Sequence, residues 1–191
     1  LDLLAVNDLP HPSLLAFRRR LLLDRAGLEQ VAAMDERTVK TLATTSEQAV
    51  ATELGDAELV VPIAGLGGDM GSWGASLVAR VAALKGAVSL AVVTTPFSVE
   101  GSLRRAVAAD ALKLLRTHAH GVLALSNDPL LRIAPHLPVA KALDAMARIA
   151  VQPVRDLLRV LTREDLPLLK SVLRGAEEWQ LGIGEGGREH P

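Results

Sequence analysis

The chain has 191 residues, of which 49% are hydrophobic, with a formal net charge of −1 and no cysteine. This size and hydrophobic content are typical of one well-filled domain, and the balanced charge argues against a nucleic-acid-binding surface. The absence of cysteine excludes disulfides, cysteine nucleophiles and thiolate metal sites, and fits a cytoplasmic location. No apolar stretch has the length of a transmembrane helix and no signal-peptide pattern opens the chain, so we expect no integral membrane segment.

The first quarter of the chain carries the weakest pattern. Residues 3–6 form a short apolar run that is typical of a buried strand. The pattern of residues 13–25 fits either a helix or a strand, and that of 27–45 is helical but irregular. Residues 46–54 predict a helix that Gly55 ends.

From residue 59 onward, strands and helices alternate. Apolar runs at 59–64, 87–93 and 121–125 predict buried strands, and helical spacing of apolar residues predicts helices at 77–84 and 102–118. This alternation indicates an α/β fold with a parallel sheet and helices on both faces. Such sheets bind ligands at the carboxyl ends of their strands.

The last third of the chain is mainly helical. A long helix is predicted at about 139–161, bent near Pro153 because an interior proline removes a hydrogen bond. A short helix follows at 165–173, and residues 182–186 begin an element that the chain is too short to finish.

A glycine-dense stretch at 65–74 joins the strand at 59–64 to the helix at 77–84. Glycines let a phosphate approach the main chain, and the first amides of a helix carry a partial positive charge, so this junction suits an anion. The alternative is a plain tight turn in an α/β sheet.

The order of these motifs resembles the FtsZ and tubulin superfamily of polymerising GTPases, and FtsZ more than tubulin. The matching stretches lie at 3–8, 64–74, 95–104, 126–131, 151–158 and 182–186. By this resemblance, residues 64–74 are the signature loop that holds the GTP phosphates, 95–104 contact the ribose, and the step from Asn127 to Asp128 contacts guanine.

The resemblance also implies a domain organisation. Residues 1–161 would form a three-layer, Rossmann-like nucleotide-binding domain that lacks the family's first strand and loop and includes the long central helix. Residues 162–191 would hold a catalytic-loop-like segment, a short helix and the start of an incomplete second domain. Because the chain begins at Leu1 rather than Met, we expect a segment truncated at both ends.

The family's functional positions transfer to individual residues of this chain. The implied nucleotide-binding residues are Gly67, Gly68, Gly71 and Ser72 for the phosphates, Pro96, Glu100 and Arg104 for the ribose, and Asn127 and Asp144 for the base. The implied ligand is GTP or GDP, with Mg²⁺ as its accompanying ion and no metal held by the protein alone. Because Glu100 and Arg104 lie four residues apart, a simple ion pair is the alternative for them. We expect the three histidines near the end of the domain, His118, His120 and His136, to lie at the surface rather than to bind a metal.

The signature loop departs from the family at three positions. Asp69, Met70 and Trp73 stand where small residues cradle the phosphates. A carboxylate about 4 Å from a phosphate charge would be repelled by roughly 4 kcal/mol at an effective dielectric of about 20. Unless a cation or an outward side-chain conformation relieves it, Asp69 weakens binding. Trp73 is interpreted as a packing residue rather than a base platform.

The catalytic segment departs as well. The family uses Asn, Asp and Asp on a neighbouring subunit to polarise water, and these positions align with Arg163, Asp165 and Leu168. Asp165 is the remaining catalytic candidate, which favours a GTPase whose hydrolysis is impaired or lost. The alternative is that Thr162 caps the next helix, and that Glu164 and Asp165 favour its N-terminus electrostatically.

The sequence therefore predicts a protein for GTP-linked, head-to-tail filament assembly in cell division or cell shape, by self-association or with a related FtsZ-like protein. A non-catalytic paralogue that acts as a structural or regulatory filament partner is the alternative. A dinucleotide enzyme is disfavoured because no Gly-x-Gly-x-x-Gly turn precedes an acidic ribose ligand at the required spacing.

Overall fold

The computed structural model describes residues 2–33 and 44–175. The strands are β1 (Leu4–Asn7), β2 (Arg19–Leu22), β3 (Leu59–Val60), β4 (Ile63–Gly65), β5 (Val88–Thr95) and β6 (Gly121–Ser126). The α-helices are α1 (Arg25–Ala32), α2 (Thr45–Leu54), α3 (Ala75–Leu84), α4 (Ser102–His118), α5 (Asp128–Ile133), α6 (Val139–Val160) and α7 (Leu166–Gly175). Short turns of helix are η1 (Pro12–Ala16), η2 (Met70–Gly74), η3 (Ser98–Glu100) and η4 (Arg163–Asp165), of which η2 is a π-helical turn.

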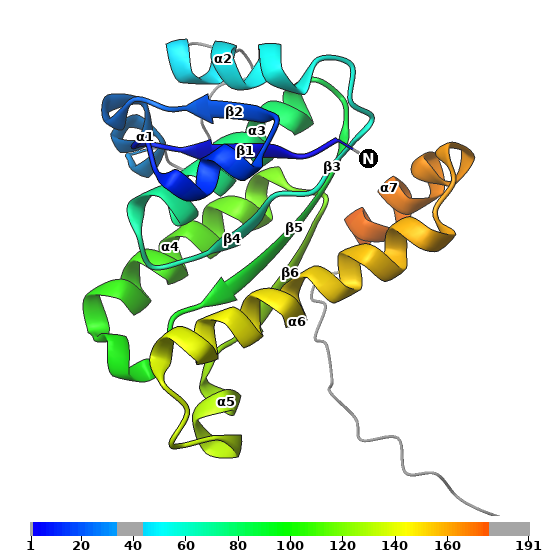
Figure 1. Ribbon diagram of the computed structural model, residues 1–191. Coiled ribbons are helices and arrows are strands. Elements are labelled where there is room, and N and C mark those ends of the chain that lie inside the picture. The colour runs from blue at the N-terminus through cyan, green and yellow to red at the C-terminus, as the bar shows by residue number, and fades with distance from the viewer. Residues whose placement is uncertain (1, 34–43, 176–191) are drawn as a thin grey trace, which may run out of the picture.

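The main sheet is built around β5, and all its pairs are parallel (Figure 1). β6 pairs with one side of β5, while β3 and β4 pair with the other side in one continuous register. The sequence predicts a single strand at 59–64, and the structure breaks it because Pro62 has no amide hydrogen to donate. The carbonyl of Pro62 still accepts from the Val92 amide at 2.8 Å, so the alignment survives the break.

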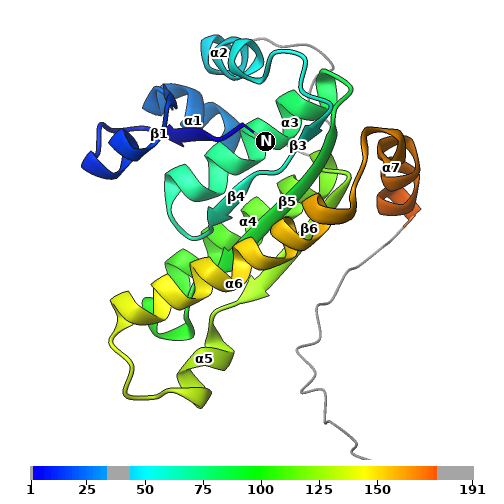
Figure 2. The ribbon, with the colours of Figure 1, turned by 45° about the vertical axis from the view of Figure 1, so that its right-hand side comes forward.

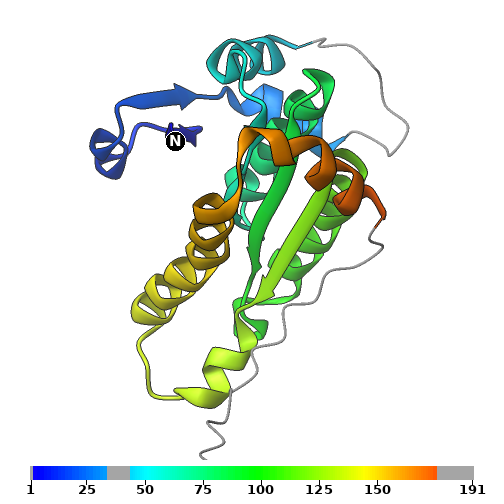
Figure 3. The same cartoon turned by 90° about the vertical axis from the view of Figure 1, so that its right-hand side faces the viewer.

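Helices cover both faces of this sheet, as the alternation of strands and helices predicts (Figure 3). Along β5, Ala91 and Val93 pack with α3 and α4 in one apolar cluster, and Val92 packs on the opposite face with α6. Successive side chains of a strand point to opposite faces, so a nearly unbroken apolar strand serves two helical layers. The three-layer α/β fold is therefore confirmed.

A smaller unit lies beside this core (Figure 2). β1 and β2 form a separate two-stranded parallel sheet, and α1 and α2 pack against α3. Between α2 and α3, the Arg80 Nε lies 2.6 Å from Glu47 Oε1, with exposed side-chain fractions of 3% and 0%.

Burial, and secondarily the charge of Arg80, lowers the pKa of His118 at the end of α4.

The long predicted elements agree with the structure, and the short ones differ from it. The helices at 46–54, 102–118 and 139–161 correspond to α2, α4 and α6, and α6 continues through Pro153. In the uncertain stretch 13–25, the structure has η1 and then β2, and α5 is an element that the sequence analysis does not predict. Residues 182–186 lie outside the described residues. Among the described residues, no helix combines the length and hydropathy needed to cross a membrane.

Candidate functional site

Three loops meet at the carboxyl end of the main sheet. Gly65 of β4 is aligned with Thr94 of β5, and Thr95 of β5 is aligned with Ser126 of β6. The signature loop, the segment after β5 and the segment after β6 therefore begin side by side. This is the edge where open parallel sheets bind ligands.

The signature loop is held in shape by Ser72. Its buried hydroxyl accepts a hydrogen bond from the Gly67 amide at 3.0 Å. Gly67 has φ of +101°, and a Cβ there would lie 3.2 Å from both the Arg104 carbonyl oxygen and Pro96 Cγ. The structure thus brings Gly67, Ser72, Pro96 and Arg104 together.

Two other glycines of the loop have different surroundings. A Cβ at Gly71 would overlap the carbonyl oxygen of Gly65, so this position accepts no side chain without movement of the main chain. A Cβ at Gly68 would meet no atom within 4 Å. Gly71 therefore packs the loop against the strand, while the space beside Gly68 is open to a ligand.

The segment after β5 is fixed by Glu100. Its Oε1 accepts from the Phe97 amide at 2.8 Å, and its Oε2 lies 3.2 Å from Arg104 Nη1. The ion pair that the four-residue spacing suggests is therefore present. The main chain of Arg104 lies beside Gly67, where a Cβ would be 3.2 Å from the Arg104 carbonyl oxygen, and the role of both side chains toward a ligand stays a prediction.

The segment after β6 offers an acceptor for a ligand. Asn127 is 2% exposed, and its Oδ1 has no hydrogen-bond partner among the described residues. Asp128 Oδ1 accepts from the Ser98 amide at 2.7 Å, which ties this segment to the one after β5. A buried acceptor without a donor is costly, and the N–H groups of a guanine ring are donors of the required kind. The residues present thus fit a guanine nucleotide.

Asp144 lies in α6, which begins at the same end of the molecule where β6 ends (Figure 1). Its carboxylate is exposed and accepts from Arg148 Nη2 at 3.0 Å. No hydrogen bond within the described ranges joins Asp144 to the three loops, so its role toward the base stays a prediction.

The three residues at which the signature loop departs from the family, Asp69, Met70 and Trp73, each have contacts in the structure. Asp69 Oδ2 lies 3.2 Å from Arg25 Nη2, so an arginine offsets the carboxylate charge. Met70 and Trp73 are partly buried and pack against the apolar cluster of α1, α2 and α3, as the packing interpretation of Trp73 requires. Arg25 is the residue that sequence reasoning missed, because nothing local in the sequence signals a contact over 44 positions.

Asp165 lies at the opposite end of the sheet. The Thr162 amide and hydroxyl both donate to Asp165 Oδ2, at 2.8 and 2.6 Å, and these hydrogen bonds lower the pKa of Asp165. The capping arrangement that the sequence analysis gives as the alternative is therefore present. These hydrogen bonds engage Oδ2 of Asp165, and the catalytic role of Asp165 stays a prediction.

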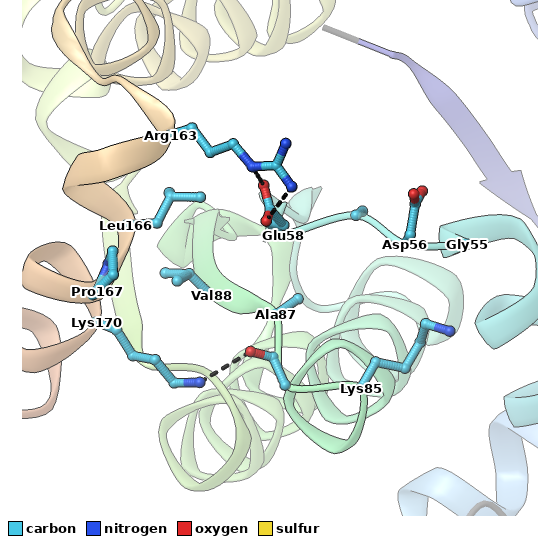
Figure 4. Close-up of a pocket in the computed structure, with 12 residues that line it drawn as sticks. Gly55, Asp56, Glu58, Lys85, Ala87, Val88, Arg163, Leu166, Pro167 and Lys170 are labelled. Carbon is cyan, nitrogen blue, oxygen red and sulfur yellow. Dashed lines mark hydrogen bonds and ion pairs between the residues drawn. The ribbon is translucent and has the colours of Figure 1, made fainter.

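The segment around Asp165 borders a pocket of about 440 Å³ at the amino ends of β3 and β5 (Figure 4). Arg163 Nε lies 2.6 Å from Glu58 Oε2, and Lys170 Nζ donates to the Gly86 carbonyl at 3.0 Å. Val88, the first residue of β5, also lines this pocket. These contacts dock η4 and α7 onto the end of the sheet that lies away from the three loops.

The histidines are only partly as expected. His136 is exposed, but His118 and His120 are half-buried, so the surface interpretation is wrong for these two. The His120 ring accepts from the Ser89 amide at 3.1 Å because the turn after α4 folds back on β5. Within residues 2–33 and 44–175, no group of three or more His, Asp or Glu side chains could hold a metal ion.

Comparisons with known proteins place these observations in a family. Residues 8–135 match the family model described as "Tubulin/FtsZ family, GTPase domain". The cell division protein FtsZ of Methanothermobacter thermautotrophicus is 34% identical over 145 residues, which cover 73% of this chain and 38% of that protein. Cell division protein FtsZ 1 of Archaeoglobus fulgidus is 30% identical over 195 residues, covering 98% of this chain and 53% of the relative. The chain thus spans about half the length, or less, of these relatives.

A solved structure agrees in fold. An empty FtsZ dimer from M. jannaschii aligns with a TM-score of 0.70 at 23% identity, covering 90% of this chain and 52% of that one. At this identity the likeness supports the fold alone, and it is consistent with the three layers described above.

Proposed function

We propose that this chain, which belongs to the Tubulin/FtsZ family, binds a guanine nucleotide at the carboxyl end of its main sheet and assembles head to tail into filaments in the cytoplasm. The filaments would serve cell division, as the names of the relatives suggest, or cell shape. The partner would be a second copy of the chain or a related protein of the same family.

One observation carries the nucleotide proposal. Gly67, fixed by the Ser72 hydroxyl, lies against Pro96 and Arg104, while the buried Asn127 acceptor sits at the end of the neighbouring strand. Phosphate, ribose and base positions thus follow one another across three adjacent strand ends. The space beside the main chain at Gly68 is open, which suits the phosphates, and bound Mg²⁺ would offset part of their charge.

The assembly proposal rests on the distance between the two ends of the sheet. β5 runs from Val88, beside the Asp165 segment, to Thr95, beside the nucleotide loops. At about 3.3 Å per residue, these ends lie roughly 23 Å apart. Asp165 cannot reach a nucleotide in its own subunit, so any action of Asp165 on a phosphate requires a neighbour stacked on this chain.

The non-catalytic alternative is favoured by a specific observation. Arg163, aligned with a catalytic amide of the family, pairs with Glu58, and the carboxylate oxygen of Asp165 serves as a helix cap. Arg163 thus holds η4 on its own subunit, and Asp165 closes the turn that begins at Thr162. The non-catalytic alternative therefore predicts a chain that binds the nucleotide but hydrolyses it slowly or not at all.

Binding of a fluorescent GTP analogue in the presence of magnesium tests the nucleotide proposal. Ser72→Ala removes the acceptor of the Gly67 amide, and a buried amide without a partner costs about 1–3 kcal/mol, so affinity should fall about tenfold or more. Ser89→Ala is the matched control, because the Ser89 hydroxyl is equally buried and has no partner among the described residues. No saturable binding by the unmodified chain would refute the proposal.

Sedimentation with and without GTP tests assembly. The proposal predicts that GTP increases the sedimenting fraction and that Ser72→Ala removes the increase. Sedimentation that is indifferent to nucleotide would instead support a structural paralogue, and a chain that never sediments would contradict the filament proposal.

A further inference from the structure

The three residues that distinguish the signature loop from its family are linked to α1 by an ion pair and by an apolar cluster that α1 shares with α2 and α3. Met70 and Trp73 pack against the cluster that includes Leu28 and Val31 of α1. Asp69, between them and the glycines, pairs with Arg25, the first residue of the same helix. The loop and α1 therefore form one packing unit.

The positive charge that faces Asp69 in this unit comes from α1. Asp69 is 56% exposed and adjoins Gly68, where the space beside the main chain is open. Like charges repel strongly when they are only partly solvated, so an uncompensated carboxylate would oppose a phosphate here. The Arg25 guanidinium, 3.2 Å from the carboxylate, supplies one positive charge at this point, and its Nε also lies 3.6 Å from Glu29.

We propose that Arg25 is a positioning residue of the phosphate site, whose guanidinium neutralises Asp69 and holds it toward α1 so that the loop can receive the phosphates of a guanine nucleotide. The inference rests on the proposed function. Arg25, which lies on α1, would explain how the proposed phosphate loop can contain the carboxylate of Asp69.

A purely structural role makes a different prediction. Exposed ion pairs contribute little to folding stability, so the Arg25–Asp69 pair would affect neither folding nor ligand binding if it were an ordinary surface contact. Charge compensation predicts instead that the effect of changing Arg25 depends on whether the carboxylate of Asp69 is present. A double-mutant cycle measures this dependence directly.

The experiment is calorimetric titration of four forms of the chain, the unmodified protein, Arg25→Gln, Asp69→Asn and the double variant. The ligands are GDP with magnesium and inorganic pyrophosphate. We expect Arg25→Gln to weaken both ligands about tenfold, and Asp69→Asn to restore most of that loss in the double variant. Arg25→Lys should retain most of the affinity, because lysine also supplies the charge, and the loss in Arg25→Gln should shrink at high ionic strength.

Lys113→Gln is the matched control. Lys113 also forms an exposed ion pair, with Asp110 at 3.0 Å on α4, but this pair is not on the signature loop. Its removal should leave both affinities unchanged.

The outcomes separate this inference from the function on which it rests. If the unmodified chain binds and Arg25→Gln binds equally well, or loses the same factor with and without the Asp69 carboxylate, only the role of Arg25 is overturned. If the unmodified chain binds neither GDP nor pyrophosphate, both proposals fall.

Discussion

At the scale of single residues, two glycines of the signature loop have different roles: Gly71 is needed for packing of the loop, and Gly68 leaves space for a ligand. Neither requires a positive φ, but a Cβ at Gly71 would overlap the Gly65 carbonyl, whereas a Cβ at Gly68 would meet open space. The sequence shows both simply as glycines in a dense run. Only the fold distinguishes a glycine that packs from one that leaves room for a ligand.

Alanine at these two positions should therefore have opposite effects. Gly71→Ala forces the main chain apart and should lower the free energy of unfolding by about 1–3 kcal/mol. Gly68→Ala should change it by less than about 0.5 kcal/mol but weaken GTP binding, because the methyl group occupies the open space. Chemical denaturation and nucleotide titration measure the two effects. Equal loss of stability in both variants would contradict this assignment.

Asp165 makes the stability of the η4 and α7 region depend on pH. Hydrogen bonds from Thr162 lower the pKa of this carboxyl in the folded state. A lowered folded-state pKa gives stability that is present above the unfolded pKa of about 3.9 and is lost as the pH falls through the folded value.

The acid limb of the stability curve should therefore become shallower in Asp165→Asn. Thermal unfolding between neutral pH and about pH 3 measures this limb, and the difference in stability between Asp165→Asn and the unmodified chain should be constant near neutrality and become smaller below about pH 4. Glu164→Gln is the control, because Glu164 is an exposed neighbour in the same turn. Parallel curves for Asp165→Asn and the unmodified chain would show that the hydrogen bonds do not contribute.

At the scale of elements, the sequence predicts what periodicity and composition determine locally. The apolar β5 and the amphipathic α4 and α6 are long enough to be read directly, and the motif order locates the three loops. The pairing of β1 with β2, the existence of α5 and the contact of α1 with the signature loop depend on partners distant in sequence. Short elements are stabilised by such contacts rather than by local propensity, so one sequence does not reveal them.

The buried pair between α2 and α3 shows how strongly such contacts hold one element on another. Glu47 also accepts from the Thr44 amide at 3.0 Å, so one carboxylate both caps α2 and binds Arg80. Arg80→Met leaves this carboxylate buried beside an apolar side chain and should cost about 3–5 kcal/mol. Lys113→Met, at an exposed pair, should cost less than about 1 kcal/mol. Similar unfolding free energies for the two variants would mean that the Glu47–Arg80 pair contributes no more than a surface contact.

At the scale of the whole molecule, the structure divides the proposed chemistry between two ends. The three loops proposed to bind the nucleotide follow the carboxyl ends of β4, β5 and β6, and the Asp165 segment is anchored at the amino ends through Arg163 and Lys170. The proposed site, completed by two subunits, would make turnover depend on assembly. The sequence predicts the pieces of this site by resemblance, and the separation of the two ends follows from the length of β5.

Mixing two defective variants tests this division. Ser72→Ala impairs the nucleotide end and Asp165→Asn impairs the other end, so each alone should hydrolyse GTP more slowly than the unmodified chain. In a mixture, an intact nucleotide end of one variant can meet an intact Asp165 of the other, and phosphate release should exceed the sum of the separate rates. Strictly additive rates would contradict catalysis between subunits. An unmodified chain that binds and assembles with GTP but releases no phosphate would identify the non-catalytic filament partner, since Arg163 would then serve only to pair with Glu58 and Asp165 only to close its own turn.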